Sequence, residues 1–167
     1  MAKPPDIGTT APDFTLPSVT VAAGIARRGN LTLSAERGHP VVLAFYPGDD
    51  TPVCTRQLCA YTSELSVFTD LNATVWAISP QTLHSHETFA RRNALGFPLL
   101  ADTEKAVIDG YGVGMFGIGV RRSVFVIDAT GVVRWRFIGL VGLRYPTVAT
   151  IATAVEAARA PFEPVAE

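Results

Sequence analysis

The chain has 167 residues, a formal net charge of −1 and a hydrophobic content of 48%. A chain of this length can form one domain that buries about 70% of its unfolded surface, and we expect a single domain over residues 1–167 with a flexible tail at 160–167. The nearly neutral charge gives no indication of a nucleic acid or an anionic membrane as partner, and no apolar run approaches the roughly 20 residues that span a bilayer.

The first predicted elements are strands. Residues 1–6 carry no apolar stretch behind Lys3, so we expect no signal peptide and a cytoplasmic location. Phe14–Leu16 and Leu31–Leu33 are predicted as short edge strands that a long loop joins. Val41–Tyr46 is a continuous apolar run, which is typical of a strand covered on both faces.

An amphipathic helix is predicted to begin shortly after this third strand. Thr51 can cap its N-terminus, and Pro52 suits its first position. Apolar residues then recur at i, i+3, i+7 and i+10, namely Leu58, Tyr61, Leu65 and Phe68. This spacing predicts a helix that packs one face against the core.

The middle of the chain alternates between strands and helices. Thr74–Ile78 is predicted as a second buried strand, and Leu83–Leu95 as a helix that Gly96 ends. Leu99–Leu100 is a short strand candidate, and Thr103–Ile108 is predicted as a short helix.

The C-terminal part is predicted to form a hairpin and a final helix. Val124–Ile127 and Val132–Phe137 flank the turn-forming segment Asp128–Gly131. Pro146 opens a helix that Pro161 stops, and its apolar face comprises Ile151, Val155 and Ala158. This order of elements predicts an α/β fold of the thioredoxin-like kind, with a mixed central sheet flanked by helices.

Cys54 and Cys59 are the only two cysteines of the chain. Taken alone, a buried cysteine is usually inert packing, but the local context of Cys54 indicates chemistry. With Thr51 as the helix cap, Cys54 is about the third helical residue, where backbone amides lack partners and the helix dipole is positive. Both effects favour the thiolate, which is the nucleophilic form of cysteine.

Charged residues near this thiol call for a balancing cation. Asp49 and Asp50 oppose a thiolate through like charge. Arg56 is close in the sequence, but Arg122 is the stronger candidate because it precedes a predicted strand and can reach the site across the sheet. The adjacent Arg121 is the alternative for the same role.

Such a pocket suits a peroxide. Free amides, a hydroxyl and a guanidinium can hold two adjacent oxygens in line with sulfur, with Thr51 beside the sulfur and Pro47 shielding it. Attack leaves a sulfenic acid on Cys54, with which Cys59 can condense to a disulfide. In a regular helix, Cα atoms five residues apart are separated by roughly 8.7 Å, but a disulfide needs about 7 Å or less. We therefore predict that the first turn or two of the helix unwinds on oxidation.

The residues around Cys54 resemble a known family. The pattern Pro47-x3-Thr51-x2-Cys54 matches the peroxiredoxin active-site motif. Residues 45–56, together with Cys59, resemble the peroxiredoxin Q group, also called bacterioferritin comigratory protein.

The resemblance extends over most of residues 7–158. Ala11–Leu16 is similar to the opening of the family, and Tyr111–Val113 and Arg122–Asp128 are similar to its later segments. Val53 and Gln57 depart from the pattern, in which Gly and Glu are common at these positions.

The resemblance implies a thiol peroxidase that reduces hydrogen peroxide and organic hydroperoxides. Cys54 would be the peroxidatic cysteine and Cys59 the resolving cysteine of an atypical two-cysteine enzyme, recycled by thioredoxin or a related dithiol protein. Thr51 and Arg122 would bind the peroxide and activate the thiolate, while Pro47 would shield it. We expect a monomer, with a dimer as the alternative.

Two further signals point away from cofactors and metals. The G-x-G-x-x-G match at residues 112–117 lies between a predicted helix and a strand, which reverses the order that a dinucleotide-binding motif needs. His84 and His86 do not share a helix face, and we expect both on the solvated surface. Since no second Cys/His cluster completes a tetrahedral site, we expect neither a metal nor a cofactor.

Three alternatives to a peroxidase stay open. A dithiol oxidoreductase favours Cys-x-x-Cys rather than the spacing found here, and a Cys–His hydrolase needs a histidine that no motif supplies. A non-catalytic module could use the two cysteines to sense oxidant for a partner. The Pro–Thr–Cys pattern favours the peroxidase.

Overall fold

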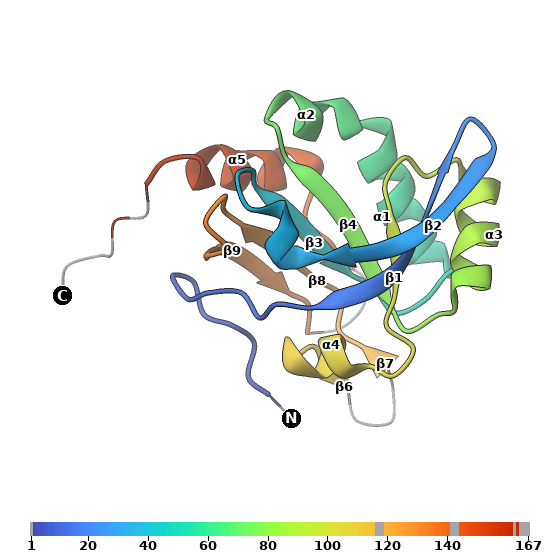
Figure 1. Cartoon of the computed structure of the whole chain (residues 1–167), viewed down its shortest axis with the longest axis horizontal. Coiled ribbons are helices and arrows are strands. Elements are labelled where there is room, and N and C mark those ends of the chain that lie inside the picture. Colours follow the sequence, from blue (N-terminus) through green and yellow to red (C-terminus); the bar gives the residue numbers. More distant parts are fainter. Residues whose placement is uncertain (1, 116–118, 141–143, 162, 164–167) are drawn as a thin grey trace.

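The computed structural model describes residues 2–115, 119–140, 144–161 and 163. Its centre is a seven-stranded mixed sheet with the strand order β2-β1-β5-β4-β3-β8-β9 (Figure 1). The strands are β1 (Thr15–Ala22), β2 (Ile25–Thr32), β3 (Val41–Phe45), β4 (Thr74–Ser79), β5 (Leu99–Ala101), β8 (Ser123–Ile127) and β9 (Val133–Ile138). The central strands β3, β4 and β5 are parallel to one another, and β8 runs antiparallel to β3.

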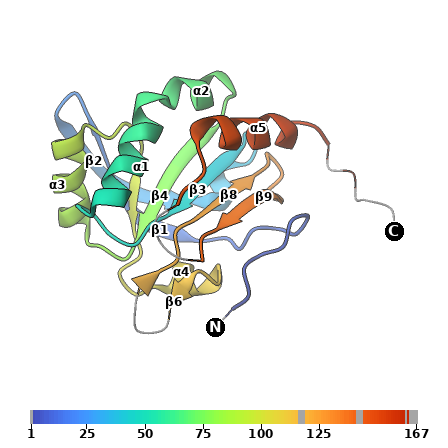
Figure 2. The ribbon, with the colours of Figure 1, turned by 180° about the vertical axis from the view of Figure 1, so that it is seen from behind.

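Helices cover both faces of this sheet. One face packs against α1 (Pro52–Ser63), α2 (Leu65–Asp70), α3 (Leu83–Asn93) and α5 (Val148–Ala158), which Figure 2 shows from behind. The other face carries the 3-10 helix η1 (Leu33–Glu36), α4 (Ala106–Gly110) and the two-residue strands β6 (Gly114–Met115) and β7 (Gly119–Val120). The predicted thioredoxin-like α/β fold with a mixed central sheet is confirmed.

Strand β3 divides its side chains between two apolar clusters. Val42 and Ala44 face the cluster under α1, while Leu43 and Phe45 face the cluster under α4. Because both faces are covered, all five residues of β3 are apolar and buried, which confirms the sequence prediction for this strand. The C-terminal end of β3 leads through a short loop into α1.

The prediction of two short edge strands joined by a long loop is wrong. β1 and β2 are strands of eight residues each that form one hairpin, whose turn contains Ala23 (φ 50°) and Gly24 (φ 75°). Two consecutive residues with positive φ suit the right-handed twist of a tight hairpin. Ala is an uncommon residue at such a position, so the sequence lacks the usual turn signal.

Four helix boundaries also differ from the predictions, and one of them is the start of the last helix, which begins at Val148 rather than at Pro146. The apolar stripe from Leu58 to Phe68 is split by Glu64 (φ −112°, ψ 21°) into α1 and α2, a break that the spacing of the stripe does not reveal. Helix α3 ends at Asn93 because Ala94, rather than Gly96, adopts the left-handed conformation. The short helix expected from Thr103 begins three residues later, as α4.

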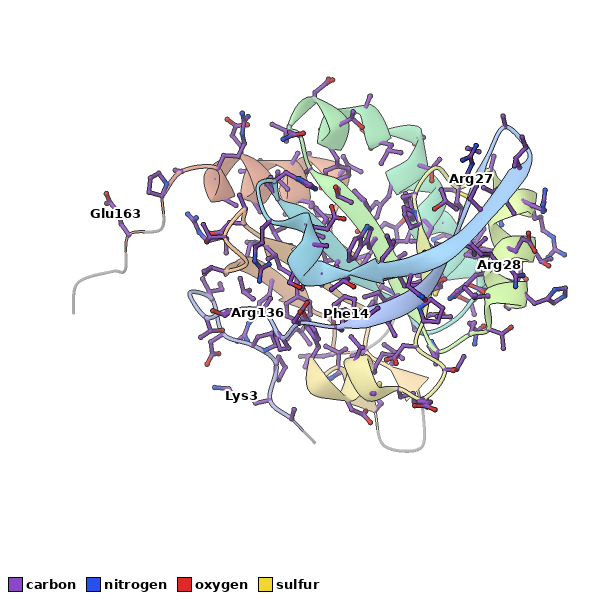
Figure 3. All side chains as sticks on the ribbon, viewed as in Figure 1. Lys3, Phe14, Arg27, Arg28, Arg136 and Glu163 are labelled. Carbon is purple, nitrogen blue, oxygen red and sulfur yellow. The ribbon has the colours of Figure 1, made fainter. Side chains whose placement is uncertain are left out.

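The described N-terminal segment packs against the edge strand β9. Arg136 of β9 donates hydrogen bonds to the carbonyls of Pro4 and Pro5, which holds the N-terminal segment against the sheet (Figure 3). The tail predicted at 160–167 falls mostly outside the described residues. Within the described ranges, no helix is both long and apolar enough to cross a membrane.

Candidate active site

Cys54 lies in the first turn of α1 and is completely buried. Thr51 has the extended backbone of a helix cap, and its carbonyl accepts the first helical hydrogen bond, from the Thr55 amide at 2.9 Å. Its hydroxyl does not cap the helix but donates to the Gly48 carbonyl at 3.2 Å. Cys54 is therefore the third helical residue, as the sequence predicts, close to first-turn amides that have no partner within the helix.

Arg122 contacts the sulfur directly. Its Nη2 donates to Cys54 Sγ at 3.2 Å, and its side chain is 3% exposed. The antiparallel register of β3 and β8 pairs Phe45 with Ser123, so the residue before β8 lies beside the residues that follow β3. Arg121 is directed elsewhere and donates to the Gly112 carbonyl at 2.9 Å.

A buried relay that sequence reasoning missed holds the guanidinium. Arg122 Nη1 donates to Gln57 Oε1, whose amide nitrogen donates to the Tyr61 hydroxyl at 3.2 Å, and that hydroxyl donates to the Pro146 carbonyl at 2.8 Å. Burial raises the pKa of Tyr61, so the phenol stays protonated and keeps its donor role. The signal was available, because Cys54, Gln57 and Tyr61 are spaced at i, i+3 and i+7 on one helix face.

The two aspartates before Cys54 are each paired with α3 rather than with Arg56, which is exposed. Asp50 accepts a hydrogen bond from Arg92 at 2.9 Å on the surface. Asp49 is buried and lies 2.9 Å from the Nδ1 atom of His86. The cation predicted near the thiol is Arg122, whereas the partners of the two aspartates come from α3, a helix that the sequence analysis did not connect with the site.

The expectation of a solvated surface position is correct for His84 and wrong for His86. His86 is completely buried because it lies on the same inward face of α3 as Phe89 and Ala90, at i, i+3 and i+4. His84 is exposed. The helical spacing to Phe89 was the signal that would have separated the two histidines.

Cys59 lies one and a half turns further along α1 and is half-buried. Its thiol approaches Asn93 Oδ1 at 3.8 Å, and both cysteines are free. Because α1 is regular between the two cysteines, their sulfurs face different directions around the helix axis. A bond between them requires the helix to open.

Pro47 lies two residues after the end of β3, directly after the buried Tyr46, and is itself half-buried. Its expected shielding of the thiol stays a prediction. In the described part of the chain, no group of three or more Cys, His, Asp or Glu side chains could hold a metal ion. The glycine-rich match at 112–117 is described only as far as Met115, and residues 116 and 117 lie outside the described residues.

The chain is similar to known proteins over most of its length. The model of the AhpC/TSA family matches residues 7–136. A chloroplastic peroxiredoxin Q of Sedum lineare is 38% identical over 130 residues, covering 76% of this chain and 66% of that protein. A putative peroxiredoxin, bcp, of Coxiella burnetii is 34% identical over 135 residues, covering 77% of this chain and 85% of that protein.

Solved structures agree with the fold. The reduced 2-Cys peroxiredoxin of Plasmodium vivax superposes with a TM-score of 0.80 at 25% identity, covering 90% of this chain and 94% of that one. The chain spans 66% or less of the length of the plant relatives that it matches.

Proposed function

The chain belongs to the AhpC/TSA family, and from this premise we propose that it is a thiol-dependent peroxidase of the peroxiredoxin Q kind. The observation that carries the proposal is the 3.2 Å hydrogen bond from a buried guanidinium, that of Arg122, to the buried sulfur of Cys54 at a helix N-terminus. A fixed cation at this point favours the thiolate before the reaction and meets the charge that develops on the peroxide oxygens.

In the proposed reaction, the Cys54 thiolate attacks the nearer oxygen of hydrogen peroxide or an organic hydroperoxide. A sulfur–oxygen bond forms while the oxygen–oxygen bond breaks, and the departing oxygen takes up a proton and leaves as water or an alcohol. The sulfur becomes a sulfenic acid, and the peroxide is reduced by two electrons. Thr51 and the first-turn amides are proposed to bind the oxygens, with Pro47 shielding the thiol.

The proposed second step joins Cys54 and Cys59. The Cys59 sulfur attacks the sulfenic acid sulfur, a disulfide forms, and the hydroxyl leaves as water. A thioredoxin-type dithiol then returns both cysteines to thiols and becomes a disulfide itself. The location of both cysteines in α1 supports an intramolecular bond, provided that the start of this helix unwinds.

Rapid mixing of the reduced protein with hydrogen peroxide tests the proposal. We expect Cys54→Ser to abolish peroxide consumption, because no other described thiol has a guanidinium partner. We expect Cys59→Ser to retain the first step, to stall recycling by thioredoxin and to be overoxidised at lower peroxide concentrations. A Cys54→Ser variant that consumes peroxide at the wild-type rate contradicts the assignment.

The assembly state and the location of the protein are also proposals. We propose a monomer, which light scattering of the reduced and oxidised protein checks. We propose a cytoplasmic location, whereas the plant relatives are named as chloroplastic proteins. Fractionation of the source cells separates these two locations.

A further inference from the structure

A buried polar cluster outside the relay of Arg122 connects the loop before Cys54 with α3. The Asp49 carboxylate accepts hydrogen bonds from the Tyr46 hydroxyl at 2.7 Å and from the Ser85 hydroxyl at 2.7 Å. Its two oxygens also lie 3.0 and 2.9 Å from His86 Nδ1. The side chains of Asp49 and His86 are 1% and 0% exposed, so water screens neither of them.

The surroundings of His86 define its protonation. Nδ1 faces the Asp49 carboxylate, and Nε2 lies 3.1 Å from the carbonyl oxygen of Leu100. A neutral imidazole has one donor nitrogen and one acceptor nitrogen, whereas both nitrogens here face oxygen acceptors. The Tyr46 hydroxyl, 3.2 Å from Nδ1, already donates to Asp49. This geometry fits a ring that donates from both nitrogens, which makes its contact with Asp49 a buried ion pair.

The electrostatics of the neighbouring groups agree with this ion pair. Burial raises the pKa of Asp49, but hydrogen bonds and charge from His86, with further bonds from Tyr46 and Ser85, outweigh burial and lower it overall. Burial and the nearby Asp49 raise the pKa of Tyr46, so it faces the pair as a neutral phenol. The Cys54 thiol also lies close enough to Tyr46 to influence it.

The ion pair sits where the proposed chemistry needs movement. Asp49 is two residues before the α1 cap and five before Cys54, and its amide donates to Gln81 Oε1 at 3.0 Å. The chain from the end of β3 to the cap is thereby attached to the start of α3. When the first turn of α1 unwinds, this attachment determines how much of the preceding loop can move with it.

We propose that the buried Asp49–His86 pair is a positioning clamp that holds the Cys54 loop on α3 and sets how readily α1 opens for Cys54 to reach Cys59. The catalytic role of the clamp rests on the proposed function. Its effect on the opening of the loop is independent of that function. An intact clamp keeps Cys54 beside Arg122 for reaction with peroxide. A broken clamp populates the open form, which slows that reaction and speeds disulfide formation.

Amide hydrogen exchange of the reduced protein tests the clamp without any catalytic step. We expect His86→Gln to increase the amide exchange rates of residues 48–58 by about tenfold or more, because removing one partner leaves a buried charge unpaired. The matched control is His84→Gln, which changes an exposed histidine two residues away on the same helix. Equal exchange in residues 48–58 of His86→Gln and wild type overturns the proposal.

A double variant separates a clamp from general destabilisation. Asp49→Asn combined with His86→Gln removes both charges, so we expect it to restore part of the protection that each single variant loses. Exchange of the β3 and β4 amides reports on global unfolding, and these amides should stay better protected than residues 48–58 in every variant. If the core amides show the same protection as residues 48–58 in every variant, the loop opens only when the whole protein unfolds, the pair has only a structural role and the clamp is contradicted.

The Cys54 sulfenate either forms a disulfide with Cys59 or is overoxidised by further peroxide. The competition between these two reactions links the clamp to catalysis. We expect His86→Gln to need several times more hydrogen peroxide than wild type for half overoxidation, measured by mass spectrometry, and His84→Gln to match wild type. If wild type forms no disulfide at all, the proposed function fails, and the exchange result still decides the clamp. An unchanged overoxidation dose in a loosened variant overturns its catalytic role.

Discussion

The side chains around Cys54 divide into one that contacts the sulfur and others that hold it in place. Arg122 contacts the sulfur, while Gln57 and Tyr61 fix the guanidinium through a relay that ends on the Pro146 carbonyl. Each of these polar groups is buried, so each contact is stronger than it would be in water. A guanidinium held in this way loses little freedom when a peroxide binds.

Replacement of Arg122 tests this arrangement. We expect Arg122→Ala to lower the second-order rate constant with hydrogen peroxide about 100-fold, the usual loss when a fixed charge-stabilising donor is removed. Arg121→Ala is the control, since its guanidinium donates to the Gly112 carbonyl instead. Similar losses in both variants would mean that the contact of Arg122 with the sulfur is unimportant.

Local signals made part of this site predictable. Thr51, Pro52 and Cys54 lie in one stretch of sequence, and capping preferences alone place the thiol in the first turn. The burial of His86 was not predicted, because histidine is a polar residue and its helical spacing to the apolar Phe89 and Ala90 was not taken into account. The relay residue Gln57 was noted as a departure from a motif, not as a partner of Arg122.

At the level of elements, α1 has two roles in the proposed cycle. It holds Cys54 and Cys59 in the reduced protein, and its first turns unwind when the two cysteines form a disulfide. It carries Cys54 and Cys59 on different sides, and it is continuous from Pro52 to Ser63. The geometry of a regular helix prevents the disulfide that the proposed cycle requires. The first turns of α1 are therefore the part of the molecule in which reduced and oxidised protein should differ.

Hydrogen exchange of the two redox states checks this difference. We expect the amides of Pro52–Tyr61 to lose most of their protection when the protein is oxidised, whereas those of β3 and β4 keep theirs. A Cys59→Ser protein treated with peroxide, which cannot form the disulfide, serves as the control. Identical protection of this segment in both states would contradict unwinding.

The hairpin of β8 and β9 depends on a charged turn residue. The carboxylate of Asp128 accepts hydrogen bonds from Thr130, the Val132 amide and Arg134. Burial raises the pKa of Asp128, but these bonds outweigh burial and hold it below its ordinary value of 3.8. The ionised group therefore contributes stability above that pH, and the contribution is lost as the pH falls through the lower, folded-state pKa.

Unfolding by urea at several pH values tests this contribution. We expect Asp128→Asn to be less stable than wild type by about 1–2 kcal/mol at pH 7, because the hydrogen bonds lose their charge assistance. The difference should shrink as the pH falls through the folded-state pKa of Asp128, where the wild-type carboxyl also becomes neutral. A difference that is constant from pH 7 to pH 2 would exclude the ionic contribution.

Predictions of elements succeeded where burial dictates a pattern. The buried strands β3 and β4 and the apolar face of α5 follow from continuous or periodic hydrophobic residues. The hairpin of β1 and β2 was missed because its turn uses Ala23, and the end of α3 was misplaced because Ala94 takes a conformation usually left to glycine. At both positions the surrounding fold imposes a backbone geometry that the residue itself does not favour.

At the level of the whole molecule, Gly112 connects distant parts of the chain. It has a φ of 65°, and a side-chain carbon there would lie 2.5 Å from the backbone of Ala2 and Pro4. Only glycine allows both the backbone angle and the close approach of the N-terminal segment. This position thus joins the segment after α4 with the beginning of the chain.

Two glycine substitutions two residues apart separate these effects. We expect Gly112→Ala to lower the free energy of unfolding by about 1–3 kcal/mol, since it strains the backbone and displaces the N-terminal segment. Gly110→Ala, where a side-chain carbon meets nothing within 4 Å, should leave stability unchanged or raise it slightly. Denaturant unfolding of both variants checks the comparison, and a Gly112→Ala variant as stable as Gly110→Ala would contradict it.

The antiparallel pairing of β3 with β8 brings together two groups that are 68 residues apart in the chain. During synthesis from the N-terminus, Cys54 leaves the ribosome long before Arg122 has been translated, and it remains an unassisted thiol until β8 adds to the sheet. The proposed reactivity of Cys54 would therefore report that the central sheet is complete. When treated with peroxide, nascent chains and fragments that stop before β8 should keep Cys54 unmodified. The full-length folded chain is expected to consume the peroxide.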